Sequence, residues 1–115
     1  INEEAISACK LLNGHLYKGK DVGREQLISC MSSVEVNWFE CVTSPKCRAD
    51  DVKSVIKTFR QYIPILLETI VNLKDKDGNN ALHYAVTYKN WKVVKVVLST
   101  HGINADLFNQ VCCIH

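Results

Sequence analysis

Apolar residues recur at steps of three and four through most of the chain, which is the spacing of one buried face on a helix. A first helix is expected from Asn2, whose side chain suits an N-cap, to about Gly19. A second is expected to open at Gly23 and to end before Pro45, because the residue preceding a proline disfavours helical geometry. The expected buried positions of these two helices are Ile6, Cys9, Leu12 and Leu16, then Leu27, Met31, Val34, Trp38 and Cys41 or Val42.

Two further helices continue the same periodicity. The third is expected to start near Asp50 as its cap, and the fourth starts again at Pro64, because proline suits the first position of a helix. The third helix carries Val52, Val55, Ile56, Phe59 and Ile63 inward, and the fourth runs through Ile65, Leu66, Thr69 and Ile70. Residues 1–71 therefore predict a block of four helices.

A polar turn and two short helical patterns occupy residues 75–98. The motif Asp75-x-x-Gly78-x-Asn80-Ala81-Leu82-His83-x-Ala85 lies where an ankyrin repeat has its T-P-L-H-x-A pattern, so the segment resembles one ankyrin repeat. Gly78 permits a positive φ in the turn, and Asn80 suits the N-cap of the first short helix. The structural residues of the motif are Gly78, Asn80, Leu82, His83 and Ala85, and the second short helix carries Trp91, Val94, Val97 and Leu98.

These patterns together predict an all-α fold, an ankyrin-type helical solenoid fragment with an N-terminal helical capping block. The expected divisions are a cap at residues 1–71, the repeat at 72–103, and the start of a second repeat with a divergent tail at 104–115. A repeat buries its apolar face only against neighbours. We therefore expect an uncovered apolar face on the C-terminal side of the repeat, formed by Val93, Val96, Val97 and Ile103.

Composition and charge exclude several classes of function. The chain has 115 residues, of which 47% are hydrophobic and 23% charged, as in a globular domain. Its net charge is +2, with Lys and Arg interleaved among acids, so nucleic-acid binding is not predicted. No apolar run is long enough for a membrane span, so we expect no stable membrane insertion and a cytoplasmic location.

The six cysteines show neither a C-x-x-C pair nor zinc-finger spacing, so reduced, partly buried thiols are expected in preference to a disulfide framework. We nominate no catalytic residues, no metal ligands and no cofactor, because no nucleophile, base and orienting group are brought together. We interpret the tail Cys112-Cys113-Ile114-His115 as an ordinary divergent end of the chain. Two alternatives stay open: the tail is a prenylation box, or it binds a metal together with His101.

The turn and the inner helix of an ankyrin repeat line a concave binding surface. In this chain those positions are Asp75 and Asp77 in the turn, then Tyr84, Thr87 and Tyr88 on the helix. Carboxylates accept hydrogen bonds from Lys or Arg, and tyrosines supply contact area with a polar tip. We expect this surface to bind a basic or amphipathic peptide, and the alternative is an ordinary solvated helix face.

Three further segments resemble the KANK family of KN motif and ankyrin repeat proteins. They are Trp38-Phe39, the run from Leu73 to Val86, and Asn104-x-Asp106-x-x-Asn109. The resemblance implies a cytoplasmic adaptor, in part at the cell cortex, that holds a cortical kinesin and restrains actin assembly, and it places Tyr84 and Thr87 in the peptide groove. Talin and liprin binding belong to family segments absent from this sequence. A structural or regulatory fragment that self-associates through the uncovered apolar face is the alternative.

Overall fold

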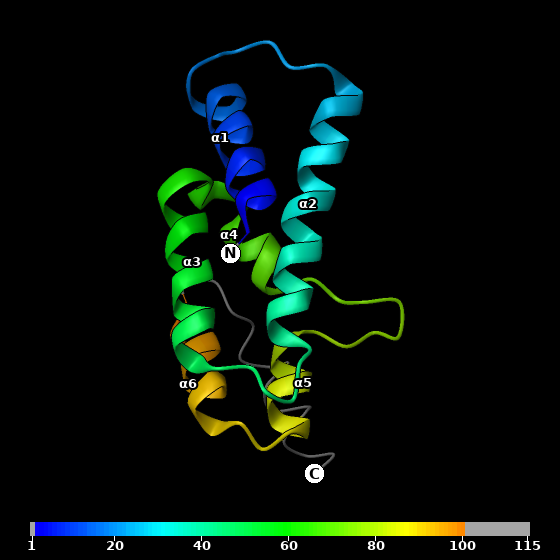
Figure 1. Cartoon of the computed structure of the whole chain (residues 1–115), viewed down its shortest axis with the longest axis vertical. Helices are drawn as coiled ribbons and strands as arrows, with labels where there is room; N and C mark the ends of the chain where they lie inside the picture. The colour runs from blue at the N-terminus through cyan, green and yellow to red at the C-terminus, as the bar shows by residue number, and fades with distance from the viewer. Residues whose placement is uncertain (1, 101–115) are drawn as a thin grey trace.

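The computed structural model describes residues 2–100, and within that range the chain forms six α-helices and no strand (Figure 1). The helices are α1 (Glu3–Tyr17), α2 (Arg24–Val42), α3 (Ala49–Tyr62), α4 (Pro64–Val71), α5 (Ala81–Thr87) and α6 (Trp91–Ser99). The all-α prediction is confirmed. The expected second repeat and tail, at residues 104–115, lie outside the described residues.

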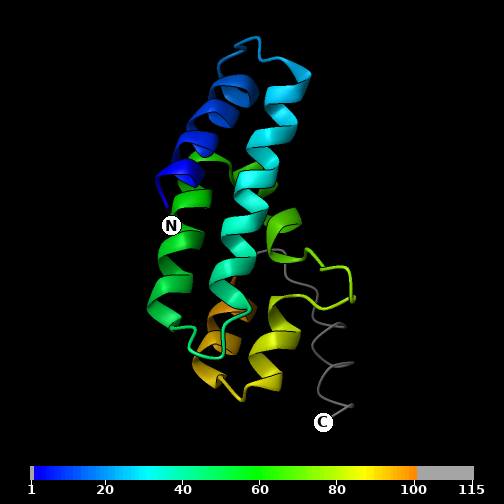
Figure 2. The same cartoon turned by 45° about the vertical axis from the view of Figure 1, so that its right-hand side comes forward.

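The helices form an elongated bundle in which α3 is the central element. Helix α1 packs along α2 at one end, α5 packs against α6 at the other, and α3 contacts α1, α2, α4 and α6. Figures 1 and 2 show α2 running from the loop that joins it to α1 down to α5, with α5 and α6 at the far end of the molecule. The two short helices of the repeat therefore rest on the long helices that precede them.

One continuous core joins all six described helices. It includes Trp38 of α2 and Phe59 of α3, both 0% exposed, whose rings lie 6.4 Å apart between centroids at an interplanar angle of 55°. Leu82 of α5 and Val97 of α6 belong to the same buried cluster. The repeat and the N-terminal block therefore bury their apolar faces against each other, as a solenoid unit requires.

The predicted N-cap at Asn2 and the predicted helix start at Pro64 are confirmed. The Asn2 side chain accepts a hydrogen bond of 2.7 Å from the backbone N–H of Ala5, and Pro64 occupies the first position of α4. The cap predicted at Asp50 is wrong. Arg48 is the N-cap residue of α3, and Asp50 lies in its first turn, where a carboxylate interacts favourably with the helix dipole.

Two apolar residues expected to be buried are exposed because they lie at the ends of the bundle. Leu16 is 41% exposed and is the last residue but one of α1. Trp91, the first residue of α6, is 58% exposed. The core positions of these helices are taken by Ala5, Ala8, Cys9 and Leu12 in α1 and by Val93, Val94, Val96 and Val97 in α6. In α2, Val42 rather than Cys41 is in the core.

The uncovered apolar face expected on the repeat is not present at three of its four positions. Val93, Val96 and Val97 are 1%, 9% and 0% exposed. Helix α6 packs against both α5 and α3. The fourth residue, Ile103, lies outside the described residues. The described helices include none that is both long and apolar enough to span a bilayer.

Candidate functional site

A tight turn at residues 75–79 leads into the repeat. The Asp75 carboxylate oxygen Oδ1 accepts hydrogen bonds from the backbone N–H groups of Asp77, at 2.9 Å, and Asn79, at 3.0 Å. The backbone N–H of Asp75 donates to the Asn79 carbonyl at 2.8 Å, and that of Gly78 donates to the Asp75 carbonyl at 3.0 Å. Gly78 has φ +83°, which only glycine adopts without strain. Asp75 therefore organises the turn through both its backbone and its side chain.

The same carboxylate ties the turn to α5. Its second oxygen, Oδ2, accepts a hydrogen bond from the Tyr84 hydroxyl. The hydrogen bond from Tyr84 is the largest cause that lowers the pKa of Asp75, and the bonds from the turn N–H groups lower it further. The same Tyr84–Asp75 bond raises the pKa of Tyr84. At neutral pH the pair is thus an ionised carboxylate and a protonated phenol, the charge-assisted arrangement that makes a hydrogen bond strong.

Helix α5 starts with a reciprocal capping box. The Asn80 side chain accepts from the backbone N–H of His83 at 2.9 Å, and His83 Nδ1 accepts from the backbone N–H of Asn80 at 3.3 Å. Asn80 is 1% exposed, and Leu82 and Ala85 point into the core beneath. The predicted cap at Asn80 is confirmed, and His83 fixes the helix start.

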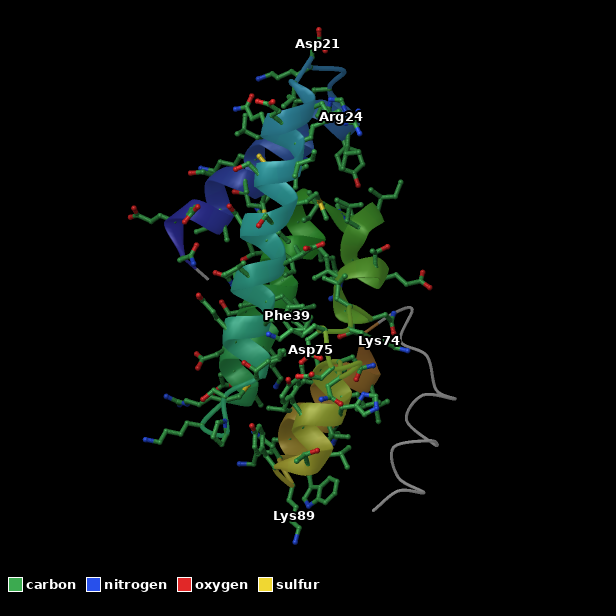
Figure 3. The ribbon with its side chains drawn as sticks, turned by 90° about the vertical axis from the view of Figure 1, so that its right-hand side faces the viewer. Asp21, Arg24, Phe39, Lys74, Asp75 and Lys89 are labelled. Carbon is green, nitrogen blue, oxygen red and sulfur yellow. The ribbon has the colours of Figure 1, made fainter. Side chains whose placement is uncertain are left out.

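The five residues predicted to contact a peptide follow one another from the turn onto the helix. Asp77, Thr87 and Tyr88 are exposed, while Asp75 and Tyr84 are half-buried and bonded to each other. The rings of Tyr84 and Tyr88 lie 6.3 Å apart between centroids, tilted by 33°. In Figure 3, Asp75 and Lys89 lie at opposite ends of α5. Asp77, Thr87 and Tyr88 are therefore the exposed members of the set, and the Asp75–Tyr84 bond joins the turn to α5.

Asn90 is a structural residue to which the sequence analysis assigned no role. Its side chain accepts from the backbone N–H of Val93, which caps α6, and donates through Nδ2 to the Cys47 carbonyl at 2.7 Å. The first role is visible in sequence as an Asn preceding an apolar run. The second joins residues 43 positions apart and carries no local signal.

The described thiols are free and the described residues contain no metal-binding cluster of three or more His, Cys, Asp or Glu side chains. Burial is the main cause that raises the pKa of Cys9 to about 11 and that of Cys41 to about 12, so both thiols are protonated at neutral pH. His101 and the tail from Cys112 to His115, for which prenylation or metal binding was considered, lie outside the described residues.

Residues 77–111 match the family model of the ankyrin repeat. The match contains the whole of α5 and α6, and it extends past the described residues. The predicted ankyrin-type fold is thereby confirmed: the chain combines an ankyrin repeat with preceding helices. Since ankyrin repeats are protein-interaction modules, this match indicates a protein partner.

Proposed function

We propose that this chain is a non-enzymatic adaptor fragment that binds a basic peptide of a protein partner along the turn and α5. The observation that carries the proposal is the exposed face of Asp77, Thr87 and Tyr88, which continues from the hydrogen-bonded Asp75–Tyr84 pair. Such a face offers a carboxylate and an aromatic ring to a partner, on a turn and helix that are already held together by the Asp75–Tyr84 bond.

Each residue of this face has a distinct contribution. The exposed Asp77 carboxylate is available to a Lys or Arg of the partner. Tyr88, 40% exposed, supplies apolar contact area with a polar tip at low cost in side-chain entropy. Asp75 and Tyr84 hold the turn against the helix through their mutual hydrogen bond, so the entropy lost on binding is small. Thr87 lies on the helix one residue before Tyr88 and can accept or donate one further hydrogen bond.

The resemblance to KANK proteins supports a more specific version of this proposal. In that version the partner is a segment of a cortical kinesin, the location is the cytoplasm near the cell cortex, and the adaptor contributes to the control of actin assembly. The helices of residues 1–71 then serve as the N-terminal cap of the repeat. Self-association was the alternative expected from the sequence, and it depended on an uncovered face that included Val93, Val96 and Val97. These three residues are buried, so they no longer support it.

Asp77→Lys and Tyr88→Ala should each weaken binding of a fluorescein-labelled peptide of alternating Lys and Leu by about tenfold. Asp77→Lys replaces an attraction to the peptide by a repulsion, and Tyr88→Ala removes an aromatic contact. Fluorescence anisotropy measures the change, first with this probe and then with the cortical kinesin segment. Asp21→Lys is the matched control, since Asp21 carries the same charge at the opposite end of the molecule (Figure 3). Equal affinities for wild type and Asp77→Lys would exclude this face as the binding site.

A further inference from the structure

A groove lies between the N-terminal end of α3 and helix α6, away from the turn at residues 75–79. Its volume is about 620 Å³, within the usual range for binding sites. In Figure 1, α3 and α6 occupy one side of the molecule and the loop that leads into α5 extends from the other. A partner bound along the turn and α5 therefore leaves this groove accessible.

The groove concentrates positive charge. Arg48 and Lys53 line it from the α3 side and Lys92 and Lys95 from α6, against a single acidic residue, Asp50. These five side chains carry a net charge of +3, whereas the whole chain carries +2. All five are exposed, so their charge is available to a molecule in the groove.

The walls of the groove are fixed to each other by the protein itself. The Asn90 side chain spans from the start of α6 to the Cys47 carbonyl, at 2.7 Å, and so joins the segments that precede the two helices. Val96, 9% exposed, lies in the lining and belongs to the core. This hydrogen bond holds the backbone of the two walls together, so the walls themselves need no ordering when a ligand binds.

We propose that this groove binds an acidic segment of a second protein, so that the chain holds two partners of opposite charge on two separate surfaces. The cations come from two helices and line a space much larger than one phosphate group needs, which favours a peptide with several carboxylates. The apolar Val96 and the aliphatic stems of the lysines offer contacts to the peptide backbone and apolar side chains.

The test uses a short fluorescein-labelled peptide in which Glu alternates with Leu, and the same peptide with Gln in place of Glu. The wild-type chain should bind the Glu peptide, with an affinity that falls as salt is raised, and should bind the Gln peptide at least about tenfold more weakly. The double variant Lys53→Glu with Lys95→Glu should lose about tenfold in affinity, because it removes two exposed ion pairs, each worth up to about 1 kcal/mol or about fivefold, and adds two carboxylates that repel the peptide.

The matched control is Lys10→Glu with Lys57→Glu, which makes the same change in net charge at exposed positions of α1 and α3 outside the groove. Circular dichroism shows whether each double variant is folded. The proposal is overturned if the Gln peptide binds as well as the Glu peptide, or if the control weakens binding as much as the groove variant. It is also overturned if inorganic phosphate displaces the peptide at equal concentration, or if phosphatidylserine vesicles bind the chain and the peptide does not.

The two proposed surfaces are separable in the same experiments. The Lys53→Glu and Lys95→Glu double variant should keep its affinity for the Lys–Leu peptide, and Asp77→Lys should keep its affinity for the Glu–Leu peptide. Loss of both affinities in one folded variant would contradict two independent surfaces.

Discussion

Trp38→Ala should lower the free energy of unfolding by about 3–5 kcal/mol, a large fraction of the stability of a small domain. Trp38 is the largest fully buried side chain of the described residues, and it packs against Phe59 at the contact between α2 and α3. Truncation removes this apolar area from the core and leaves a cavity in its place. Urea unfolding followed by circular dichroism measures the change.

The chain provides its own control for this experiment. Trp91 is 58% exposed at the start of α6, so Trp91→Ala should change the free energy of unfolding by no more than about 0.5 kcal/mol. A Trp38→Ala cost as small as that of Trp91→Ala would show that α2 and α3 do not share the core described above.

Leu82→Ala should lower the free energy of unfolding by about 2–5 kcal/mol. Leu82 is 1% exposed and carries the apolar face of α5 into the core that the long helices share. Because that core is continuous, the loss should also appear at a probe outside the repeat. In a Trp91→Phe background, tryptophan fluorescence reports on Trp38 alone, and its urea midpoint should fall together with that of the helical signal.

Thr87→Ala is the control on the same helix, since Thr87 is exposed and its substitution should leave the midpoint almost unchanged. If Leu82→Ala shifted the helical signal while the Trp38 fluorescence midpoint stayed in place, α5 would be a separate unit that unfolds independently. That result would contradict a repeat buried against the N-terminal block.

Local chemistry predicted much of the fold because several elements begin or turn at residues with a specific backbone role. Asn2 and Asn80 cap α1 and α5, Pro64 begins α4, and Gly78 takes the positive φ of the turn. Each of these preferences acts within a few residues, so the sequence reveals it. The cap at Asp50 failed because an acidic residue suits the first turn of a helix as well as its cap.

Burial was harder to predict because it depends on how the helices pack against one another. Leu16 and Trp91 fit the helical periodicity, yet both lie at ends of the bundle and are exposed. Val93 and Val96 were assigned to an uncovered face, yet α6 lies on α3 and both are buried. Periodicity identifies the apolar positions of a helix, but the tertiary arrangement decides which of them are buried against another helix.

The candidate site shows the same division between local and distant information. The sequence assigned Asp75 to the turn and Tyr84 to the inner helix of an ankyrin motif, but it did not reveal that their side chains bond to each other and hold the turn to α5. The basic groove depends on α3 and α6, which are far apart in sequence and adjacent in the fold. Lysines that look like a solvated helix side in sequence thus gather around one cavity.

The most direct test of the account is an NMR titration of the isotopically labelled chain with the Lys–Leu peptide. The account predicts that the largest amide shift changes occur at Asp77, Thr87 and Tyr88, with α1 and the loop at Asp21 unaffected. Shift changes confined to α1 and α2, or none at peptide concentrations that saturate the anisotropy signal, would contradict binding along the turn and α5.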